Sequence, residues 1–272
     1  MSNVVNATAQ GLTSGNISLT SETAESRTYG VVLRPRFIPR LNLSIDFVEI
    51  NLSNAIEQLN LVEILDACYD AANYPNDPSC SQFTRNAAHQ ITSFQDGFVN
   101  AGLLAFQGVT FGADWSVRMP GRWGEVGLRA NWLDTRKLLQ KIGSASANSL
   151  VGELGTNFAA PHGKGVIDVN YRNGGFQWYW QGLYTGPFNF DNQDTANSKN
   201  IPGVSHWWLV NTTIGYGFTR SFETRLIIDN VANKEPPFPA LAGIGGNFES
   251  PTSLYWSGII GRTYLLSAAY HF

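Results

Sequence analysis

The sequence predicts an all-β chain: an antiparallel up-and-down meander of about nine strands, part of a transmembrane β-barrel, with long loops at one end and short turns at the other. Three observations predict this fold. Apolar and polar residues alternate along most of the chain, as they do in strands with two different faces. Charged residues make up only 14%, while aromatic residues reach 12%. Short and long connections alternate between these segments, as they do in outer-membrane barrels.

Composition excludes several classes of protein. The formal charge is −3, from 18 Lys and Arg against 21 Asp and Glu, so the chain lacks the basic excess of a nucleic-acid binder. It contains no run of about 18 apolar residues, and we therefore expect no transmembrane helix. A hydrophobic content of 43% excludes a disordered chain. The first residues do not resemble a secretory signal peptide, because no basic segment is followed by an apolar one.

Each expected strand is an alternating segment whose apolar residues share one face. In the first half of the chain these segments are residues 28–37, 41–52, 108–118 and 125–134, with apolar rows that include Tyr29 and Val31, Leu43 and Ile45, Phe111 and Trp115, and Leu128 and Trp132. In the second half they are residues 164–172, 175–184, 206–218, 222–229 and 260–272, with rows that include Ile167 and Val169, Trp178 and Trp180, Val210 and Ile214, Leu226 and Ile228, and Tyr264 and Leu266. The opposite face carries mainly Gly, Asn, Gln, Thr and Asp.

The connections alternate in length. Short turns are expected at residues 38–40, 119–122, 172–174 and 219–221, and Asn173-Gly174 is the strongest hairpin signal in the chain. Long connections are expected at residues 54–99, 138–163, 188–203 and 232–257. Sequential strands with all short turns at one end form a meander, and in an outer-membrane barrel those turns face the periplasm.

A lipid-facing wall explains the pattern better than a soluble core does. Three features favour lipid: a polar face with few lysines, apolar rows that end in Trp, Tyr and Phe as interfacial girdles do, and long loops at one end only. A soluble β-sandwich also alternates, so a carbohydrate-binding module is one alternative. A small self-contained outer-membrane pore or adhesin is another, with residues 1–20 or 91–99 supplying a tenth strand.

The first long loop carries the helix-like segment Asn54–Asp70, in which Ile56, Leu59, Val62 and Leu65 recur at three-residue steps. Two cysteines, Cys68 and Cys80, follow in a polar stretch. Their spacing is too long for a CxxC redox or zinc pair. A disulfide between them requires an oxidising compartment and would tie down a loop with little apolar packing, and two unpaired thiols are the alternative.

Candidate chemistry is sparse. The four histidines show no metal-ligand spacing, and neither a nucleophile elbow nor a carboxylate pair is legible, so we expect no enzyme, no metal and no cofactor. Aromatic residues in the loops can stack on a sugar or a catechol, and an interfacial girdle is the competing interpretation of each. The candidates for substrate contact are Tyr69, Tyr74, Phe188, Phe190 and Phe248.

Several segments resemble one known family, the TonB-dependent receptors of the outer membrane. Residues 19–37 look like a strand from the middle of their barrel, and residues 43–50 continue it. Residues 64–69, with a later cysteine, are similar to a loop of one large subgroup. Residues 228–237 resemble the family's Asn-hydrophobic-Phe-Asn/Asp-Lys-x-Pro motif, with Ala232 in place of the usual Phe or Leu. Residues 261–264 and the terminal Phe272 look like the closing strand.

The resemblance implies a transporter that takes up a scarce solute, such as a siderophore, another chelate or an oligosaccharide, with energy passed through TonB. The family has roughly 22 strands, a plug and a TonB box, so the chain looks like the C-terminal portion of such a barrel without plug or box. Residues 1–22 would then be an irregular leading segment, the outer loop of a missing preceding strand, and residues 23–272 the C-terminal part of the barrel.

The same resemblance implies the partners and the location. The location is the outer membrane of a Gram-negative bacterium. The partners are outer-membrane lipid, the missing N-terminal strands and plug, the TonB complex through those missing parts, and the barrel-assembly machinery, but no nucleic acid. Tyr264, Tyr270 and Phe272 would form the signal that the assembly machinery reads. Which solute is carried does not follow from the loop sequences.

Overall fold

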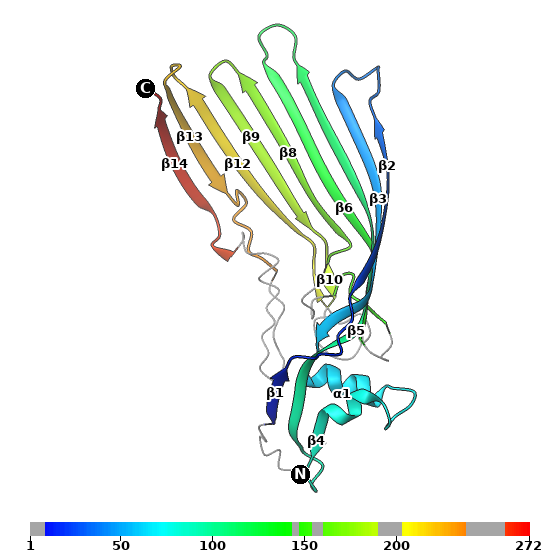
Figure 1. Ribbon diagram of the computed structural model, residues 1–272. Helices are drawn as coiled ribbons and strands as arrows, with labels where there is room; N and C mark the ends of the chain where they lie inside the picture. The colour runs from blue at the N-terminus through cyan, green and yellow to red at the C-terminus, as the bar shows by residue number, and fades with distance from the viewer. Residues whose placement is uncertain (1–8, 143–146, 154–159, 190–202, 238–258) are drawn as a thin grey trace. The chain divides into compact units, whose positions relative to one another are not determined.

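A computed structural model describes residues 9–142, 147–153, 160–189, 203–237 and 259–272 (Figure 1). The strands are β1 (Gln10–Ser14), β2 (Thr23–Leu33), β3 (Leu41–Gln58), β4 (Phe83–Arg85), β5 (Ile91–Arg118), β6 (Glu125–Ile142), β7 (Asn148–Ser149), β8 (Gly163–Asn173), β9 (Phe176–Thr185), β10 (Phe188–Asn189), β11 (Gly203–Val204), β12 (Trp207–Gly217), β13 (Phe222–Asp229) and β14 (Thr263–Tyr270). The helices are α1 (Leu61–Tyr69) and the 3₁₀ turn η1 (Pro78–Gln82). None of these helices is long and apolar enough to cross a membrane.

Nine of the strands form the predicted meander. Their order across the sheet is β14-β13-β12-β9-β8-β6-β5-β3-β2, so each strand lies beside the previous long strand in the chain. The pairs whose register is known, such as β8 with β9 and β12 with β13, are antiparallel. All nine predicted segments are therefore confirmed as strands, and the short turns join them at one end of the sheet (Figure 1).

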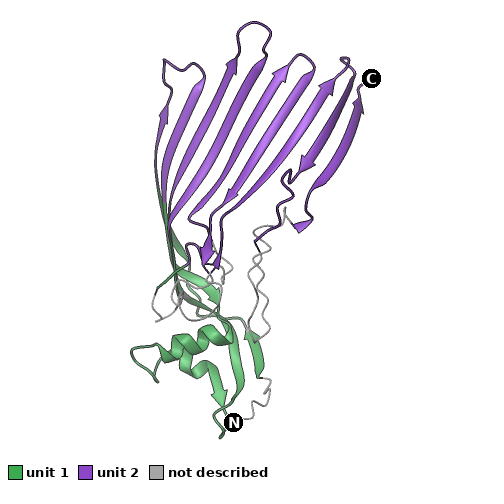
Figure 2. Cartoon of the chain, turned by 180° about the vertical axis from the view of Figure 1, so that it is seen from behind, with its two compact units in different colours: residues 1–27, 49–106, 138–149 green, residues 28–48, 107–137, 150–272 purple. Residues whose placement is uncertain are grey.

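The chain divides into two compact units (Figure 2). We call residues 28–48, 107–137 and 150–272 the sheet unit, and residues 1–27, 49–106 and 138–149 the loop unit. Within the sheet unit, β8, β9 and β12 have 11, 10 and 11 residues. A tilted strand needs roughly 9–11 residues to cross a bilayer, so these strands match one crossing.

The turns form where the sequence predicts them, for local conformational reasons. Gly174, in the Asn173-Gly174 turn, has a positive φ of 58°, which glycine adopts without strain. Gly124 closes the turn before β6 with φ 81°, and a Cβ there would lie 2.1 Å from the carbonyl oxygen of Arg172. Any side chain at this position would force neighbouring turns apart.

The sheet unit has an apolar face and a polar face. On β8, Ile167 and Val169 are 39% and 38% exposed, and on β9 Trp178 and Trp180 are 41% and 37% exposed. These values show that no second protein layer covers the apolar rows in the described structure. Asp168, Asn170 and their register partners on β9 lie on the opposite face because side chains alternate along a strand. The expected single wall with two faces is thus observed.

The strands are longer than the sequence predicts. β5 has 28 residues and β3 has 18, which makes residues 54–58 and 91–99 strand where a long connection is expected. The helix is correspondingly shorter, since α1 begins at Leu61 and buries Ile64, Ala67 and Cys68. Val62 is 64% exposed, so the predicted row at three-residue steps is not the packing face. The leading segment 1–22 contains the short strand β1, which pairs in parallel with β5.

At the long-loop end of the sheet unit, two connections fold over the polar face. Phe188, Val204, Trp207 and Leu209 form an apolar cluster against which Leu183 packs. Leu209 lies two residues from Asn211 on β12 and therefore shares its face. β10 pairs with β11, and the Asn189 amide donates to the carbonyl oxygen of Gly152 at 2.6 Å. Residues 188–189 and 203–204 are thereby packed beside the polar-face side chains Leu183 and Leu209.

Asn230, the first residue of the motif near the C-terminus, is fully buried and joins three segments. Its backbone N–H donates to Asn211 Oδ1 at 2.9 Å, and its side chain donates to the Lys234 carbonyl and accepts from the Lys234 amide. Asn233 Oδ1 accepts from the Arg262 amide at 2.9 Å. The motif therefore ties the end of β13 to β12 and to the start of β14.

We expect Val169→Arg to lower the free energy of unfolding in a membrane by about 2–4 kcal/mol, and so to destabilise the fold, because a charge in the middle of the apolar face would enter hydrocarbon. The matched control is Asn170→Arg, one residue away on the polar face of β8, which should cost far less. The measurement is the folded fraction of each variant in the outer membrane. Equal losses at the two positions would contradict the assignment of the faces.

We expect Asn230→Ala to destabilise the chain by about 1–3 kcal/mol, because it removes the two hydrogen bonds that the buried side chain makes with the backbone of Lys234. Asn230 also has a positive φ of 50°, and Asn230→Gly separates the two effects because glycine accepts that φ without strain. Urea titration followed by tryptophan fluorescence measures both variants. A glycine variant as stable as the parent would show that the side-chain bonds contribute nothing.

Candidate functional site

The loop unit presents an aromatic cluster with one guanidinium, the Tyr69 cluster, made of Tyr69, Tyr74, Phe83 and Arg85. The Tyr69 ring centroid lies 5.4 Å from that of Tyr74 and 6.2 Å from that of Phe83. The Arg85 guanidinium lies 5.8 Å from the Tyr69 ring centroid and 5.4 Å from that of Phe83, and it donates to the Tyr69 hydroxyl at 2.5 Å. Tyr69 and Tyr74 are 46% and 52% exposed, so their rings can receive a planar ligand.

A disulfide holds this cluster in place. Cys68 and Cys80 are bonded, with their Cα atoms 4.8 Å apart, and the prediction of the bond is confirmed. Cys68 precedes Tyr69 at the end of α1, and Cys80 lies in η1, just before Phe83. The bond closes a loop of about a dozen residues, which in the chain-entropy model contributes roughly 3 kcal/mol. It fixes the two segments that carry the aromatic rings.

A capping box begins α1. The Asn60 side chain accepts from the amides of Val62 and Glu63, and Glu63 Oε2 accepts from the Asn60 amide at 2.8 Å. Three otherwise unpaired amides at the helix start, those of Asn60, Val62 and Glu63, are thereby satisfied. The spacing of Asn60 and Glu63 is visible in the sequence and would have located the helix start.

Glu63, in the first turn of α1, has a raised pKa. Burial is the largest influence and raises the pKa of Glu63 above its ordinary 4.5, the hydrogen bond from the Asn60 backbone opposes that rise, and the carboxylates of Glu57, Asp96 and Asp66 add to it. Folded Glu63 therefore holds its proton more tightly than the unfolded chain does. It follows that the contribution of Glu63 to stability is fully present below about pH 4.5 and is lost as the pH rises through the raised pKa.

The polar face of the sheet unit carries a chain of hydrogen bonds across three strands. Asp168 Oδ1 accepts from the Tyr179 hydroxyl at 2.5 Å and from Gln181 Nε2 at 3.1 Å. Asn211 Nδ2 donates to Gln181 Oε1 at 3.3 Å and so extends the chain from β8 and β9 to β12. Arg129 on β6 pairs with Asp114 on β5 at 3.4 Å. These side chains form a hydrogen-bonded polar wall on this face of the sheet unit.

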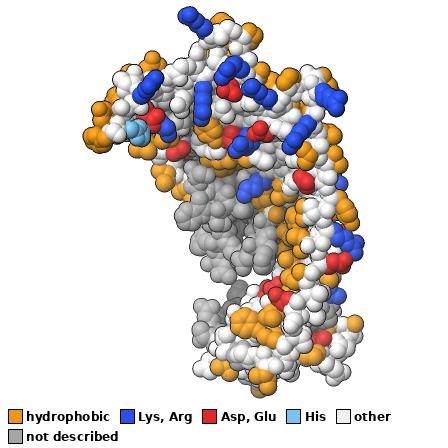
Figure 3. Space-filling model, turned by 45° about the horizontal axis from the view of Figure 1, so that its top comes forward, with side chains coloured by type: hydrophobic (Ala, Val, Ile, Leu, Met, Phe, Trp, Pro, Cys, Tyr) orange, Lys and Arg blue, Asp and Glu red, His pale blue; other side chains and the backbone are white. Residues whose placement is uncertain are grey.

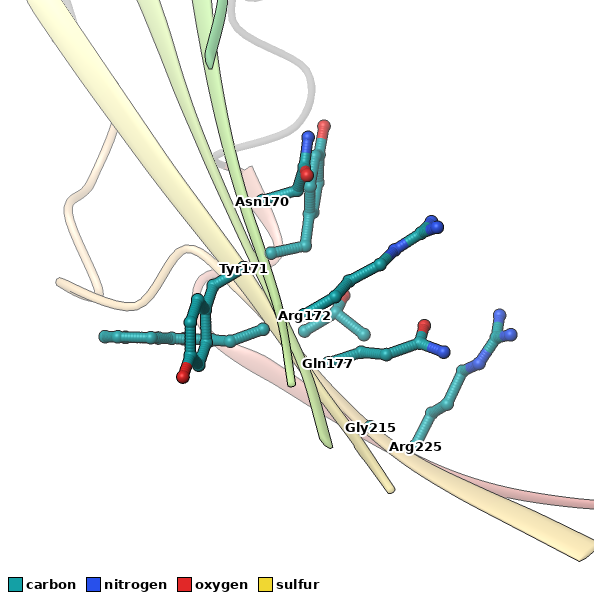
Figure 4. Close-up of a pocket in the computed structure, with 9 residues that line it drawn as sticks. Asn170, Tyr171, Arg172, Gln177, Gly215 and Arg225 are labelled. Atoms are coloured by element: carbon teal, nitrogen blue, oxygen red, sulfur yellow. The ribbon is translucent and has the colours of Figure 1, made fainter. Parts of the chain in front are cut away.

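Two hollows lie on the sheet unit. One, of about 610 Å³, is lined by residues of β3, β5, β6, β8 and β9, including Asp46, Asn131 and Lys164. The other, of about 300 Å³, lies nearer the short turns, and Arg172, Gln177 and Arg225 contribute to it (Figure 4). Among the described residues, no three His, Cys, Asp or Glu side chains are grouped as metal ligands.

The sequence-predicted site residues lie in different surroundings. Tyr69 and Tyr74 come together in the loop unit, whereas Phe188 packs in the apolar cluster of the sheet unit and is 2% exposed. Phe190 and Phe248 lie outside the described residues. On the last strand, Tyr264 and Tyr270 are more than 60% exposed, and the ring centroid of Tyr270 lies 5.2 Å from that of Phe272. Arg85 was missed, and no pattern in the sequence marks it.

Comparison with known proteins identifies the family of the chain. The family described as "TonB dependent receptor-like, beta-barrel" matches residues 2–231. The chain belongs to this family. Membership places the chain in the outer membrane of a Gram-negative bacterium, and the family consists of transport receptors rather than enzymes. No curated protein sequence matched the chain.

Solved TonB-dependent receptors share the fold. The outer membrane transporter YddB from Escherichia coli has a TM-score of 0.59 and 8% identity, over 98% of this chain and 34% of that one. The siderophore receptor PirA from Acinetobacter baumannii has a TM-score of 0.56 and 14% identity, over 96% of this chain and 33% of that one. The ferric-catecholate import receptor Fiu from E. coli K12 has a TM-score of 0.53 and 14% identity, over 94% of this chain and 29% of that one. The chain thus spans about a third of each receptor.

We expect Glu63→Gln to remove the pH dependence of α1, because the amide oxygen still accepts from Asn60 but carries no ionisable proton. Hydrogen-exchange protection of the Ile64 amide, which donates to the Asn60 carbonyl oxygen, should fall between pH 4.5 and pH 7 in the parent and stay level in the variant. Asp66→Asn removes only the smallest of the influences that raise the pKa of Glu63, so this variant should keep the parent's trend with a reduced amplitude. A variant that follows the parent would exclude Glu63 as the cause.

Proposed function

We propose that this chain is the C-terminal part of the barrel of an active outer-membrane transporter that takes up a ferric chelate with energy delivered through TonB. The family match over residues 2–231 carries the proposal, and the uncovered apolar face and hydrogen-bonded polar face support it. The remaining barrel strands and the plug would belong to parts outside this chain. TonB would act through those parts, and this chain would supply outer loops and part of the lumen wall.

An iron chelate is the favoured substrate class because of the structural neighbours. Fiu is described as a ferric-catecholate import receptor and PirA as a siderophore receptor. At 14% identity these likenesses establish the fold alone, so the substrate is carried over as a proposal. An oligosaccharide, which the sequence leaves open, is the alternative outcome of the uptake test.

The Tyr69 cluster is the proposed contact with the chelate in the outer loops. Tyr69 and Tyr74 offer exposed rings for stacking on an aromatic ligand, a contact of about 0.5–1.5 kcal/mol beyond area burial. Arg85 is already fixed against Tyr69 and would supply a cation beside an anionic ligand. Phe190 and Phe248 stay candidates from the sequence, whereas burial leaves Phe188 little surface to offer a ligand.

Insertion would depend on the last strand and on the apolar rows. Tyr264, Tyr270 and Phe272 expose their rings on and beside β14, an edge strand of the described sheet. We propose that they form the signal that the barrel-assembly machinery recognises. The apolar rows on β8 and β9 would then meet lipid directly.

Strand direction argues against a small self-contained barrel. The described meander has nine strands, with β2 and β14 at its two edges. Because the strands alternate in direction, β2 and β14 run the same way (Figure 1), and direct closure would pair them in parallel. Antiparallel closure needs an odd number of further strands between them, which a longer receptor would provide.

The uptake test uses the native host. Deleting the gene that encodes this chain should lower uptake of radioactive iron from a catecholate chelate at least tenfold in iron-limited cells, and the intact gene should restore it. Restoration with a Tyr69→Ala/Tyr74→Ala gene should raise the half-saturation concentration about tenfold, since 1.4 kcal/mol of lost stacking corresponds to that factor.

Phe37→Ala is the matched control, because Phe37 is 84% exposed in a short turn of the sheet unit. It should leave the half-saturation concentration unchanged. Unaltered chelate uptake after deletion, together with lost oligosaccharide uptake, would reassign the substrate. Unaltered uptake of both solutes would overturn the transport proposal.

A further inference from the structure

We propose that the short-turn end of the sheet unit binds the headgroups of anionic phospholipids, through Arg122 and Arg220 and the aromatic rings beside them. We call these two arginines, with Trp123, Phe218 and Phe222, the turn surface. The proposal rests on the proposed function in one respect, since that function places the sheet in a bilayer with its short turns toward the periplasm. It adds which lipid the turns select, and lipid binding is measured without transport.

The short connections of the sheet unit carry positive charge only. Residues 34–40, 119–124, 174–175 and 218–221 contain no Lys, Asp or Glu, but they contain five arginines: Arg34, Arg36, Arg40, Arg122 and Arg220. The connection of residues 59–90 has the opposite balance, with four acidic residues and one arginine. Figure 3 shows Lys and Arg side chains gathered at the short-turn end with hydrophobic side chains beside them. Such a field attracts anions.

Two of these arginines lie in turns well inside the sheet. Arg122 joins β5 to β6, and Arg220 joins β12 to β13. The connection of residues 34–40 follows the edge strand β2, and its Arg40 lies 3.8 Å from Glu125. The proposal therefore uses Arg122 and Arg220, which are both exposed.

The β12–β13 turn carries Arg220 between two residues whose rings stack. The Phe218 amide donates to the Phe222 carbonyl oxygen at 3.0 Å and closes the turn. Thr219 Oγ1 accepts from the amides of Ser221 and Phe222 at 3.2 and 3.0 Å. The ring centroids of Phe218 and Phe222 lie 5.7 Å apart, with 29° between the ring planes. A hydrogen-bonded turn thus presents one guanidinium and two rings together.

The rings beside Arg220 continue the apolar face of the sheet unit. Tyr216 shares that face with Ile214, two residues earlier on β12, and its ring centroid lies 4.9 Å from that of Phe218. Tyr216 and Phe218 are 47% and 59% exposed. The plug of the proposed receptor would lie against the polar face, and further strands would extend the sheet beyond β2 and β14. Neither part would cover these rings.

The β5–β6 turn repeats the combination of an arginine with an aromatic ring. The Met119 amide donates to the Gly124 carbonyl oxygen at 2.9 Å and closes this turn. Gly121 and Gly124 adopt positive φ values of 68° and 81°, which glycine accepts without strain. Arg122 and Trp123 are adjacent between these glycines, and Trp123 is 71% exposed. The same pair of chemical groups therefore occurs in two separate turns.

The two groups together select the ligand. Aromatic side chains of membrane proteins collect at the level of the lipid headgroups. Guanidinium binds phosphate oxygens through two parallel hydrogen bonds, and an anionic leaflet attracts each arginine near its surface. An arginine beside an interfacial ring therefore suits a phospholipid, with the phosphate at the guanidinium and the acyl chains beside the ring. A headgroup with a net negative charge gains most, since no cation of its own cancels the phosphate.

The test measures the lipid preference of the full chain, purified in a neutral detergent from outer membranes of cells that produce it. Energy transfer from tryptophan to a pyrene-labelled lipid reports binding in mixed micelles. Phosphatidylglycerol should bind about fivefold more tightly than phosphatidylcholine, the factor that corresponds to about 1 kcal/mol for one arginine near an anionic headgroup. Added salt should reduce this preference, because it screens exposed charges. Inorganic phosphate at millimolar concentration should not displace either lipid.

Three variants locate the effect. Arg122→Gln/Arg220→Gln should bind the two lipids equally, because it removes both guanidinium groups of the turn surface. The matched control, Lys141→Gln/Arg172→Gln, also removes two positive charges, one from the other end of β6 and one from the polar face, and should keep the preference. Phe218→Ala should weaken both lipids by a similar factor, because the ring contacts acyl chains and not the headgroup charge. The tryptophan emission maximum checks that each variant is folded.

The outcomes distinguish this proposal from the transport proposal. Equal binding of the two lipids by the parent, or a preference that persists in Arg122→Gln/Arg220→Gln, would overturn the turn surface. So would a preference lost in the control variant, or displacement of phosphatidylglycerol by inorganic phosphate, which would make the ligand a free anion. None of these results bears on the uptake test, which measures iron entry into cells. An uptake failure with an intact lipid preference would remove the transport proposal and leave the turn surface.

Discussion

Backbone hydrogen bonding between neighbouring strands is the constraint on which the rest of the molecule depends. Hydrocarbon offers no partner to an N–H or C=O group, so a strand in lipid must be paired on both edges. The meander satisfies this for its inner strands in sequence order. It also fixes which side chains share a face. The apolar rows and the polar wall are consequences of that pairing.

The period-two pattern was sufficient to predict the nine strands, because each strand of the sheet unit carries an apolar row on one face and polar residues on the other. It failed where that division of faces ends. Residues 91–106 of β5 lie in the loop unit, and there neither face has to be apolar, so the alternation fades while the strand continues. The same reason hides the extension of β3 to Gln58. Strand ends outside a membrane carry little periodic signal.

The candidate sites were less predictable, since they depend on contacts between distant segments. The Cys68–Cys80 bond could be proposed because the loop is local in sequence. Arg85 could not be linked to Tyr69, because the hydrogen bond between them depends on how η1 and β4 return to α1. The hollow lined by Gln177 and Arg225 depends on the register of β9, β12 and β13. Long connections separate some of these strands, and a sequence does not specify register across them.

The polar face carries several acidic groups, and those described below have partners within the wall. Arg172 differs from them. Asp114 pairs with Arg129, and Glu223 pairs with Arg225. Asp168 accepts from Tyr179 and Gln181. The carboxylates in these contacts have partners within the wall, whereas Arg172 has none among the described residues despite facing Glu125 in register. An unpaired guanidinium beside paired ones gives the wall a local excess of positive charge.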